Sequence, residues 1–204
     1  MVNINDLIKD LNRNAERLDS LEDVINEYFS ESRCMTVADI EPEVGIMIEN
    51  LIRFFNYQDR ELNIPIELRR PIKIYIDSMG GDLSAAFTII DAIQLSDTPV
   101  WTINIGAAYS GGFLIFIAGH KRYCYPHSSF LLHEGSAGTS GTAIQFENFS
   151  AHYKRQLKQL KALVLSKTAI TEEKYNEICK DDFWLLAEDA VELNIADEIL
   201  TYLI

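Results

Sequence analysis

The sequence predicts an α/β fold built on a largely parallel sheet. Short apolar segments alternate along the chain with longer segments whose apolar residues recur every three or four positions. This repeated order of strand, loop and helix indicates βαβ crossovers, which place the helices outside the sheet. Ligands of such sheets collect at the carboxyl ends of the strands, so functional residues are expected there.

Composition limits the class of protein. The 204 residues suit one domain or one domain with an appendage, and 48% hydrophobic with 24% charged residues is typical of a soluble globular protein. The net charge of −13 argues against nucleic acid as a partner, because phosphate binding needs clustered Lys and Arg. Three scattered cysteines predict neither a disulfide framework nor a CxxC metal site, and they suit a reducing cytoplasm. No cofactor is expected.

Residues 1–32 are predicted to form a helical extension, and residues 33–204 the main domain. The extension reads as one or two amphipathic helices whose apolar stripe packs either on the main domain or on a neighbouring subunit. It lacks the basic start and apolar run of a secretory signal. No segment approaches the roughly 18 uninterrupted apolar residues of a membrane span.

The first part of the main domain alternates strands with helices. Arg33 to Asp39 is predicted as a strand and Val44 to Phe55 as a helix. The apolar face of this helix is expected to contain Met47, Ile48, Leu51, Ile52 and Phe55. In Pro71 to Asp77, isoleucines alternate with polar residues, which is typical of a strand. A glycine turn and the helix Leu83 to Leu95 follow.

The middle of the domain continues the same alternation. Pro99 to Ile105 is predicted as a strand, Gly106 to Gly112 as a small-residue turn, and Phe113 to Gly119 as a short buried helix. Lys121 to Tyr125 and Ser129 to His133 are expected to be two further strands.

The last part begins with a glycine- and serine-rich segment, Gly135 to Gly141, which predicts a mobile loop. Ala143 to Lys167 has aromatic residues and leucines at helical steps and predicts one long helix. A helix that opens near Thr171, a strand at Phe183 to Leu186, another helix and a final apolar stretch are expected to follow.

The segment Ser78-Met79-Gly80-Gly81 follows the strand that ends at Asp77. Paired glycines there let the backbone approach a ligand closely and direct an N–H group at a developing oxyanion. A tight turn from strand to helix would need the same residues, so this motif alone does not decide between the two.

Ser110 lies in the small-residue segment between a predicted strand and a predicted helix. A serine in such a turn exposes its hydroxyl beside backbone donors, as a nucleophile elbow does. The N–H of Gly111 would lie at a helix N-terminus, where negative charge is favoured. A serine at this place also suits the simpler role of capping the helix.

His133 ends an apolar strand directly before the glycine loop. A serine hydroxyl is a poor nucleophile until an imidazole takes its proton, and His133 suits this role. The alternative is a structural hydrogen bond at the end of the strand. The other three histidines are expected at the surface or in turns: His120, His127 and His152.

Asp182 precedes two aromatic residues, which could hold its carboxylate dry enough to orient an imidazole and stabilise its cation. An acidic pair before an aromatic strand is also typical of a solvated turn. From the residues alone, Asp181 fits the argument as well as Asp182.

Together and in this order, the four segments resemble the ClpP family, the proteolytic subunits of self-compartmentalised ATP-dependent proteases. Tyr75 to Gly81 is similar to the family's strand and SPGG turn, and Gly106 to Gly112 to its GxAASxG serine motif. Tyr125 to Glu134 resembles the LPNS and histidine segment, and Asp182 to Ala190 the stretch that holds the triad aspartate. The resemblance covers about residues 33–204.

The resemblance assigns roles to particular residues. It implies a catalytic triad of Ser110, His133 and Asp182, and it selects Asp182 over the aspartate that precedes it. The oxyanion donors that it implies are the backbone N–H groups of Gly81 and Gly111. No metal or cofactor enters this chemistry.

The resemblance also implies a ClpP/crotonase-like spiral of ββα-type units, with Ala143 to Lys167 as a long handle helix. The expected function is a cytoplasmic serine endopeptidase that cleaves peptides or unfolded proteins. It would act within a homo-oligomeric ring, heptameric by resemblance, with an AAA+ unfoldase as a further partner. Two alternatives are the acyl-CoA hydratase branch of this fold, which needs no Ser-His-Asp set, and an inactive ring subunit that serves as scaffold or regulator.

The sequence departs from the family pattern at several positions. Met79 stands where proline is usual, Tyr109 replaces an alanine, and Ser129 replaces an arginine before the histidine strand. Asp181 stands where the family usually has an arginine used in contacts between rings, which favours a single ring over a stacked double ring. Residues 1–32 do not resemble the family's axial loops, which weakens the expectation of a Clp-type ATPase partner.

Overall fold

The computed structural model describes residues 32–178 and 181–204. Its contacts divide the chain into two compact units, Met1–Met35 and Thr36–Ile204. The predicted helical extension therefore lies almost entirely outside the described residues, and it stays a prediction.

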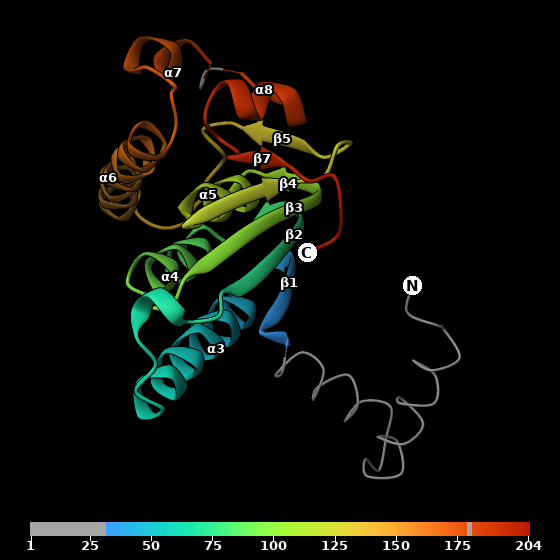
Figure 1. The fold of residues 1–204 in the computed structure, drawn as a ribbon. Coiled ribbons are helices and arrows are strands. Elements are labelled where there is room, and N and C mark those ends of the chain that lie inside the picture. Colours follow the sequence, from blue (N-terminus) through green and yellow to red (C-terminus); the bar gives the residue numbers. More distant parts are fainter. Residues whose placement is uncertain (1–31, 179–180) are drawn as a thin grey trace, which may run out of the picture. The chain divides into compact units, whose positions relative to one another are not determined.

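The described residues form a seven-stranded sheet with helices packed on it (Figure 1). Strands β2 and β3, β3 and β4, β3 and β5, and β4 and β7 pair in parallel, whereas β5 and β6 pair antiparallel. The predicted α/β fold with a largely parallel sheet is confirmed. The strands are β1 (Cys34–Ile40), β2 (Ile72–Gly81), β3 (Val100–Tyr109), β4 (Lys121–Cys124), β5 (Ser129–Leu132), β6 (Phe183–Leu186) and β7 (Glu198–Ile199).

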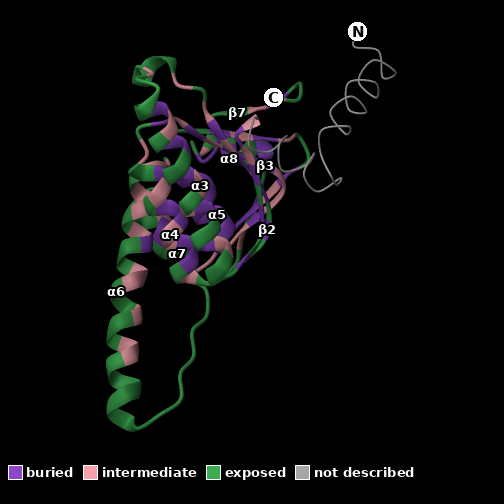
Figure 2. Cartoon of the chain, turned by 90° about the horizontal axis from the view of Figure 1, so that it is seen from below, coloured by how far each residue is buried: buried purple, intermediate pink, exposed green. Residues whose placement is uncertain are grey.

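The helices α3, α4 and α5 lie against one face of the sheet (Figure 2). Every residue of α5 is buried, because this short helix sits between the sheet and the other helices. None of the helices in the described part of the chain is long and apolar enough to cross a membrane. The helices are α3 (Pro42–Glu61), α4 (Leu83–Gln94), α5 (Gly111–Ala118), α6 (Ala143–Lys167), α7 (Glu172–Ile178) and α8 (Ala187–Glu192), with a 3₁₀ turn at Ile66–Leu68.

Three elements differ from the sequence-based prediction. Strand β2 continues to Gly81, through residues that were expected to form a glycine turn. Helix α3 is longer at both ends than expected, with proline in its first turn, where its missing N–H group costs nothing. Met47, expected on the apolar face, is 48% exposed, because the buried stripe runs through Ile48, Ile52 and Phe55 and Met47 lies beside it. Strand β3 continues to Tyr109, through residues that were expected to form a turn.

The long helix α6 has the predicted bounds. Thr142 caps it, in a capping box in which Thr142 Oγ1 and the Gln145 side chain each accept a backbone N–H. Figure 2 shows the helix projecting from the sheet, with the segment before it returning as extended chain. Among its aromatic residues, Phe146 is exposed, whereas Phe149 and Tyr153 are half-buried.

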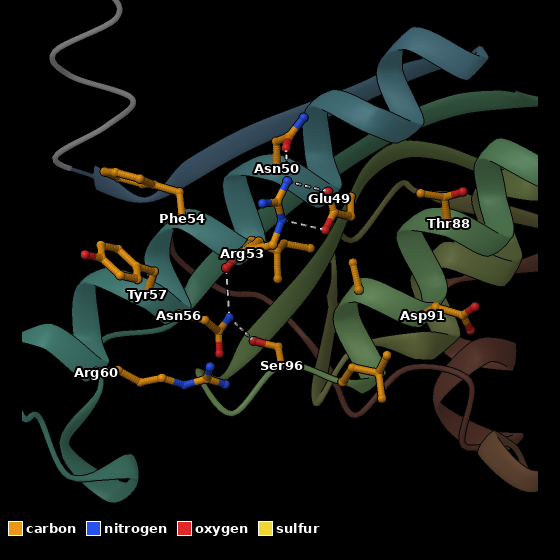
Figure 3. A pocket seen from close by; sticks show the side chains of 13 residues that line it. Glu49, Asn50, Arg53, Phe54, Asn56, Tyr57, Arg60, Thr88, Asp91 and Ser96 are labelled. Atoms are coloured by element: carbon orange, nitrogen blue, oxygen red, sulfur yellow. Dashed lines mark hydrogen bonds and ion pairs between the residues drawn. The ribbon is translucent and has the colours of Figure 1, made fainter.

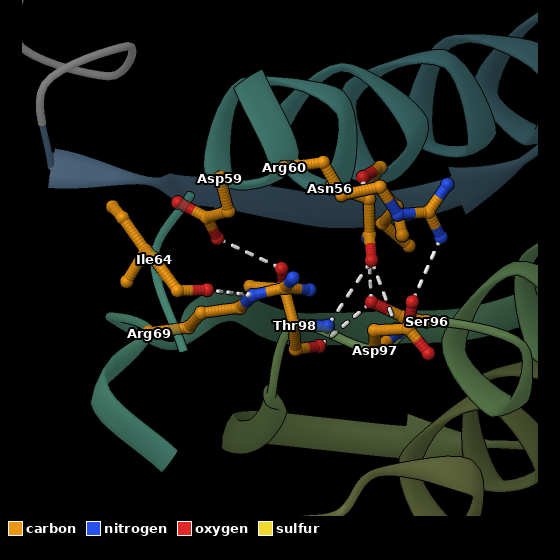
Figure 4. Close-up of polar contacts among 9 residues, drawn as sticks. Asn56, Asp59, Arg60, Ile64, Arg69, Ser96, Asp97 and Thr98 are labelled. Atoms are coloured by element: carbon orange, nitrogen blue, oxygen red, sulfur yellow. Dashed lines mark hydrogen bonds and ion pairs between the residues drawn. The ribbon is translucent and has the colours of Figure 1, made fainter. Parts of the chain in front are cut away.

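Asn56, a residue of α3 that is only 6% exposed, fixes the turn that leads from α4 into β3 (Figure 4). Its Nδ2 donates to Ile52 O at 2.8 Å and to Ser96 Oγ at 2.7 Å. Its Oδ1 accepts the backbone N–H groups of Asp97 and Thr98, at 3.0 and 3.1 Å. The side chain therefore satisfies backbone donors at the start of the strand that ends beside Ser110.

We expect Asn56→Ala to lower the free energy of unfolding by about 2 kcal/mol, because a buried N–H group left without a partner costs about 1–3 kcal/mol. Asn50→Ala, on the exposed side of the same helix, is the matched control and should change stability by less than about 0.5 kcal/mol. Urea denaturation at one protein concentration measures both. Equal losses in the two variants would contradict this role of Asn56.

Candidate active site

Ser110 has a strained backbone at the junction between β3 and α5. Its φ of 52° and ψ of −117° lie in a region that residues other than glycine rarely adopt. The sheet keeps Ser110 in this conformation, since the Ser110 N–H donates to Leu131 O at 3.0 Å. Ser110 occupies the N-cap position of α5, but its side chain makes no capping hydrogen bond to the helix.

The two glycine segments meet at Ser110. A Cβ placed on Gly80, which has a φ of 106°, would lie 2.8 Å from Ser110 Cβ and 3.3 Å from the Gly111 nitrogen. A Cβ placed on Gly81 would collide with the carbonyl oxygen of Ile40. Only glycine fits at either position, and the backbone amides of Gly81 and Gly111 lie next to each other beside the serine.

His133 and Asp182 lie opposite each other at the neighbouring ends of β5 and β6. The antiparallel pairing of β5 and β6 sets Leu132 opposite Phe183, so the residues just beyond this pair are also opposite. His133 Nδ1 lies 3.6 Å from Asp182 Oδ1, which is within ion-pair distance but too long for a hydrogen bond. The backbone register therefore favours Asp182 over Asp181 as the carboxylate near His133.

The Asp182 carboxylate was expected to be shielded from water, and in the isolated chain this expectation is wrong. The Asp182 side chain is 56% exposed, because it precedes an edge strand that pairs only with β5 among the described residues. The His133 side chain is 31% exposed, and its two nitrogens differ. Nε2 is shielded from water and has no hydrogen-bond partner among residues 32–178 and 181–204. Leaving a shielded ring nitrogen without a partner costs free energy, and in the tautomer that carries its hydrogen on Nδ1 this nitrogen can accept a proton.

Ser110 and His133 line one pocket of about 380 Å³, together with Gly81 and Gly111. The pocket is closed on one side by the loop after His133, which has no regular secondary structure, as the sequence predicts. Its apolar walls come from α5, β5 and α6, through Leu114, Leu132, Phe149 and Leu160.

Tyr153, a residue of α6, forms a hydrogen bond to the loop that follows His133. Its hydroxyl donates to the backbone oxygen of Glu134 at 3.3 Å. Burial raises the pKa of the Tyr153 phenol, and the Glu134 carboxylate raises this pKa further. The phenol therefore keeps its proton at neutral pH and stays a donor that holds the wall of the pocket.

A larger pocket, of about 860 Å³, lies between α3 and α4 (Figure 3). It exposes Phe54 and Tyr57, and one of its charged groups, Arg53, is paired with Glu49 at 3.0 Å. None of the residues that line it is a histidine or a cysteine, so it does not pair a hydroxyl with an imidazole. The smaller pocket, in contrast, contains both Ser110 and His133.

Other residues fit a catalytic role less well. Cys124 is buried, and burial raises the pKa of its thiol to about 11, which leaves it protonated and unreactive at neutral pH. His127 and His152 are exposed, and His120 accepts the backbone N–H of Val100 at Nδ1, as expected for surface and turn histidines. Among the described residues, no group of three or more His, Cys, Asp and Glu side chains could hold a metal ion.

The structure also brings together residues that the sequence did not connect. Tyr109 and Ser129, each a departure from the family pattern, have their hydroxyl oxygens 2.7 Å apart. The Tyr109 ring contacts Trp184. The sequence did show that both residues are unusual for the family. It did not show that they are in contact, because this depends on the register of the two strands.

Comparison with known proteins gives a consistent result. A family model described as Clp protease matches residues 65–202. The chain is 31% identical over 137 residues to the "ATP-dependent Clp protease proteolytic subunit 2" of Treponema pallidum, which covers 66% of this chain and 69% of that protein. The protein of the same name from Rhodococcus jostii is 36% identical over 138 residues, 65% of this chain and 69% of its own. That from Thermobifida fusca is 32% identical over 168 residues, 79% of this chain and 77% of its own. The chain thus spans about two thirds of the length of most of these relatives.

Proposed function

The chain belongs to the Clp protease family, and on this basis we propose that it is a serine endopeptidase that acts through Ser110, His133 and Asp182. The observation that carries the proposal is that one pocket contains a strained serine and an imidazole nitrogen that is shielded and has no partner in the described part of the chain. The adjacent amides of Gly81 and Gly111 support it, since acyl transfer needs donors for an oxyanion beside the nucleophile.

In the proposed reaction, Ser110 Oγ attacks the carbonyl carbon of the scissile peptide bond while its proton passes to His133 Nε2. The N–H groups of Gly81 and Gly111 stabilise the oxyanion that forms. The imidazolium then gives its proton to the leaving amine, and a water molecule activated by the same imidazole releases the acyl group from Ser110. Asp182, 3.6 Å from Nδ1, stabilises the imidazolium in both steps.

The substrate class is an extended peptide or an unfolded protein segment. An extended chain exposes its backbone carbonyls, and the apolar walls of the pocket suit one apolar side chain beside the cleaved bond. We further propose a homo-oligomeric ring, heptameric by resemblance, that encloses the sites. The words "ATP-dependent" in the names of the relatives support an AAA+ unfoldase as partner.

The direct test is hydrolysis of a short fluorogenic peptide by the wild-type chain and by His133→Ala. We expect His133→Ala to lose nearly all activity, whereas His127→Ala, which removes an exposed histidine in a turn, should retain it. Equal loss in both variants would contradict the assignment. Ring assembly without any hydrolysis would favour a scaffold or regulator, and turnover of acyl-CoA alone would favour the hydratase branch.

The first turn of α6 suits a contact between subunits. Ile144 and Phe146 are 70% and 57% exposed there, and an apolar pair of this kind is usually covered by assembly. Asp181, which lies in the turn after α7, would bring like charges to a contact between rings. The proposed assembly is therefore a single ring whose stacking is weak and sensitive to salt.

Asp181→Arg is expected to increase the fraction of stacked double rings at low salt, because the substitution removes one repulsive charge per subunit and adds the opposite one. Native mass spectrometry across salt concentrations measures this fraction. Glu192→Arg, an equal change of charge at an exposed position of α8, should leave it unchanged. An equal fraction of double rings in both variants would contradict the charge argument. A wild type that stays monomeric at micromolar concentration under every condition would contradict the proposed ring.

A further inference from the structure

Tyr109 contacts both of the strands that adjoin the other two residues of the proposed triad. It is the last residue of β3, directly before Ser110. Its hydroxyl oxygen lies 2.7 Å from Ser129 Oγ, at the start of β5. Its ring meets the ring of Trp184 in β6 edge to face, with centroids 5.1 Å apart and an interplanar angle of 85°.

The sheet register explains how one side chain reaches both strands. Tyr109 pairs with Leu131 in β5, and Leu131 pairs with Trp184 in β6, so the three residues form one row. Residues in one row of a sheet point to the same face, and the two aromatic rings therefore meet over the strand between them. Ser129 lies two residues before Leu131, on the same face, which places its hydroxyl under the end of the tyrosine ring.

The position of Asp182 depends on few contacts. It precedes β6, a strand of four residues that pairs only with β5 in the described part of the chain. The distance of 3.6 Å from His133 Nδ1 is a few tenths of an ångström beyond a hydrogen bond, so a small movement of β6 decides whether one forms. Trp184 lies two residues after Asp182, and its ring, although 55% exposed, packs against the ring of Tyr109.

We propose that Tyr109 is a positioning residue for catalysis: held by Ser129, it packs on Trp184 and so sets the distance between Asp182 and His133. The proposal rests on the peptidase function proposed above. It also accounts for two departures from the family pattern together, because a serine at position 129 supplies the hydroxyl partner of a tyrosine at position 109. The role is distinct from those of the triad, since Tyr109 acts through Trp184.

The test compares Trp184→Leu with Trp101→Leu in the full chain. Trp101 forms a matching edge-to-face pair with Tyr123, with centroids 5.4 Å apart, on strands that carry no triad residue at that end. Trp184→Leu is expected to lower kcat by about tenfold to a hundredfold with little change in KM, since a displacement of about 1 Å can cost that much. Trp101→Leu should leave kcat unchanged. Tyr109→Phe and Ser129→Ala should each lower kcat by a smaller factor, and the double variant should lose no more than either alone.

A second comparison separates positioning from general support of the fold. In an Asp182→Asn background, Trp184→Leu should change the rate of fluorophosphonate labelling by less than twofold, because the carboxylate that it positions is gone. An undiminished effect in that background would overturn the proposal.

A crystal structure of each variant gives a readout that needs no activity. The distance from His133 Nδ1 to residue 182 should lengthen in Trp184→Leu and stay the same in Trp101→Leu. An unchanged distance in Trp184→Leu would overturn the positioning role even in an active enzyme. A wild type that neither labels nor hydrolyses would instead overturn the peptidase function, and the two failures are thereby distinguishable.

Discussion

Ser110→Ala is expected to lower kcat for hydrolysis of short peptides by a factor on the order of 10⁶, since loss of the nucleophile leaves only the oxyanion donors and substrate binding. The fold should persist, because the Ser110 hydroxyl makes no capping bond to α5. Steady-state kinetics on a fluorogenic peptide, together with urea denaturation, measure the two quantities independently.

Ser166→Ala is the matched control for this variant. Its hydroxyl donates to the backbone oxygen of Leu163 on an exposed part of α6, so its loss should change neither kcat nor assembly. Hydrolysis that persists in Ser110→Ala at the wild-type rate would remove Ser110 from the mechanism. A loss of stability in Ser110→Ala alone would instead point to a structural serine.

Gly80→Ala should have the second largest effect, lowering kcat by about a hundredfold or more. The new methyl group would lie 2.8 Å from Ser110 Cβ and 3.1 Å from Tyr109 O, so either the serine or the end of β2 must move. The φ of 106° at this position adds strain for any residue with a Cβ. The rate of fluorophosphonate labelling reports the displacement directly, because it requires the serine, the base and the oxyanion donors together.

Gly138→Ala controls for the change of glycine to alanine. Gly138 lies in the loop after His133, where a Cβ would meet no atom within 4 Å, and the substitution should leave labelling within about twofold. The proposed close approach between the two glycine segments would be contradicted if Gly80→Ala labelled as fast as Gly138→Ala.

Much of the fold could be predicted from local pattern. The bounds of α6 and β6 match those expected from the sequence, because the residue pattern changes at both ends of each element. Strand β3 was predicted to stop at Ile105, since glycine and alanine there favour a turn. It continues because Ala107, Ala108 and Tyr109 find backbone partners in β5, and such pairing between distant segments overrides local propensity.

The candidate site was predictable as a set of residues but not as a geometry. Residue type and order suggested Ser110 and His133, whereas the choice of Asp182 over Asp181 needed the family resemblance, and the register of β5 and β6 now supports it. The exposure of the carboxylate could not be foreseen, because it depends on β6 having only β5 as a neighbour among the described strands. The contact between Tyr109 and Ser129 likewise joins residues 20 positions apart, through a register that single-sequence patterns do not contain.

The measurement that tests the peptidase assignment most directly is intact mass after treatment with a fluorophosphonate, on wild type and Ser110→Ala together. A fluorophosphonate reacts with a serine only where a base and oxyanion donors activate it. The account predicts one adduct per chain on the wild type and none on Ser110→Ala. An unmodified wild type, or an adduct of equal yield on Ser110→Ala, would contradict it.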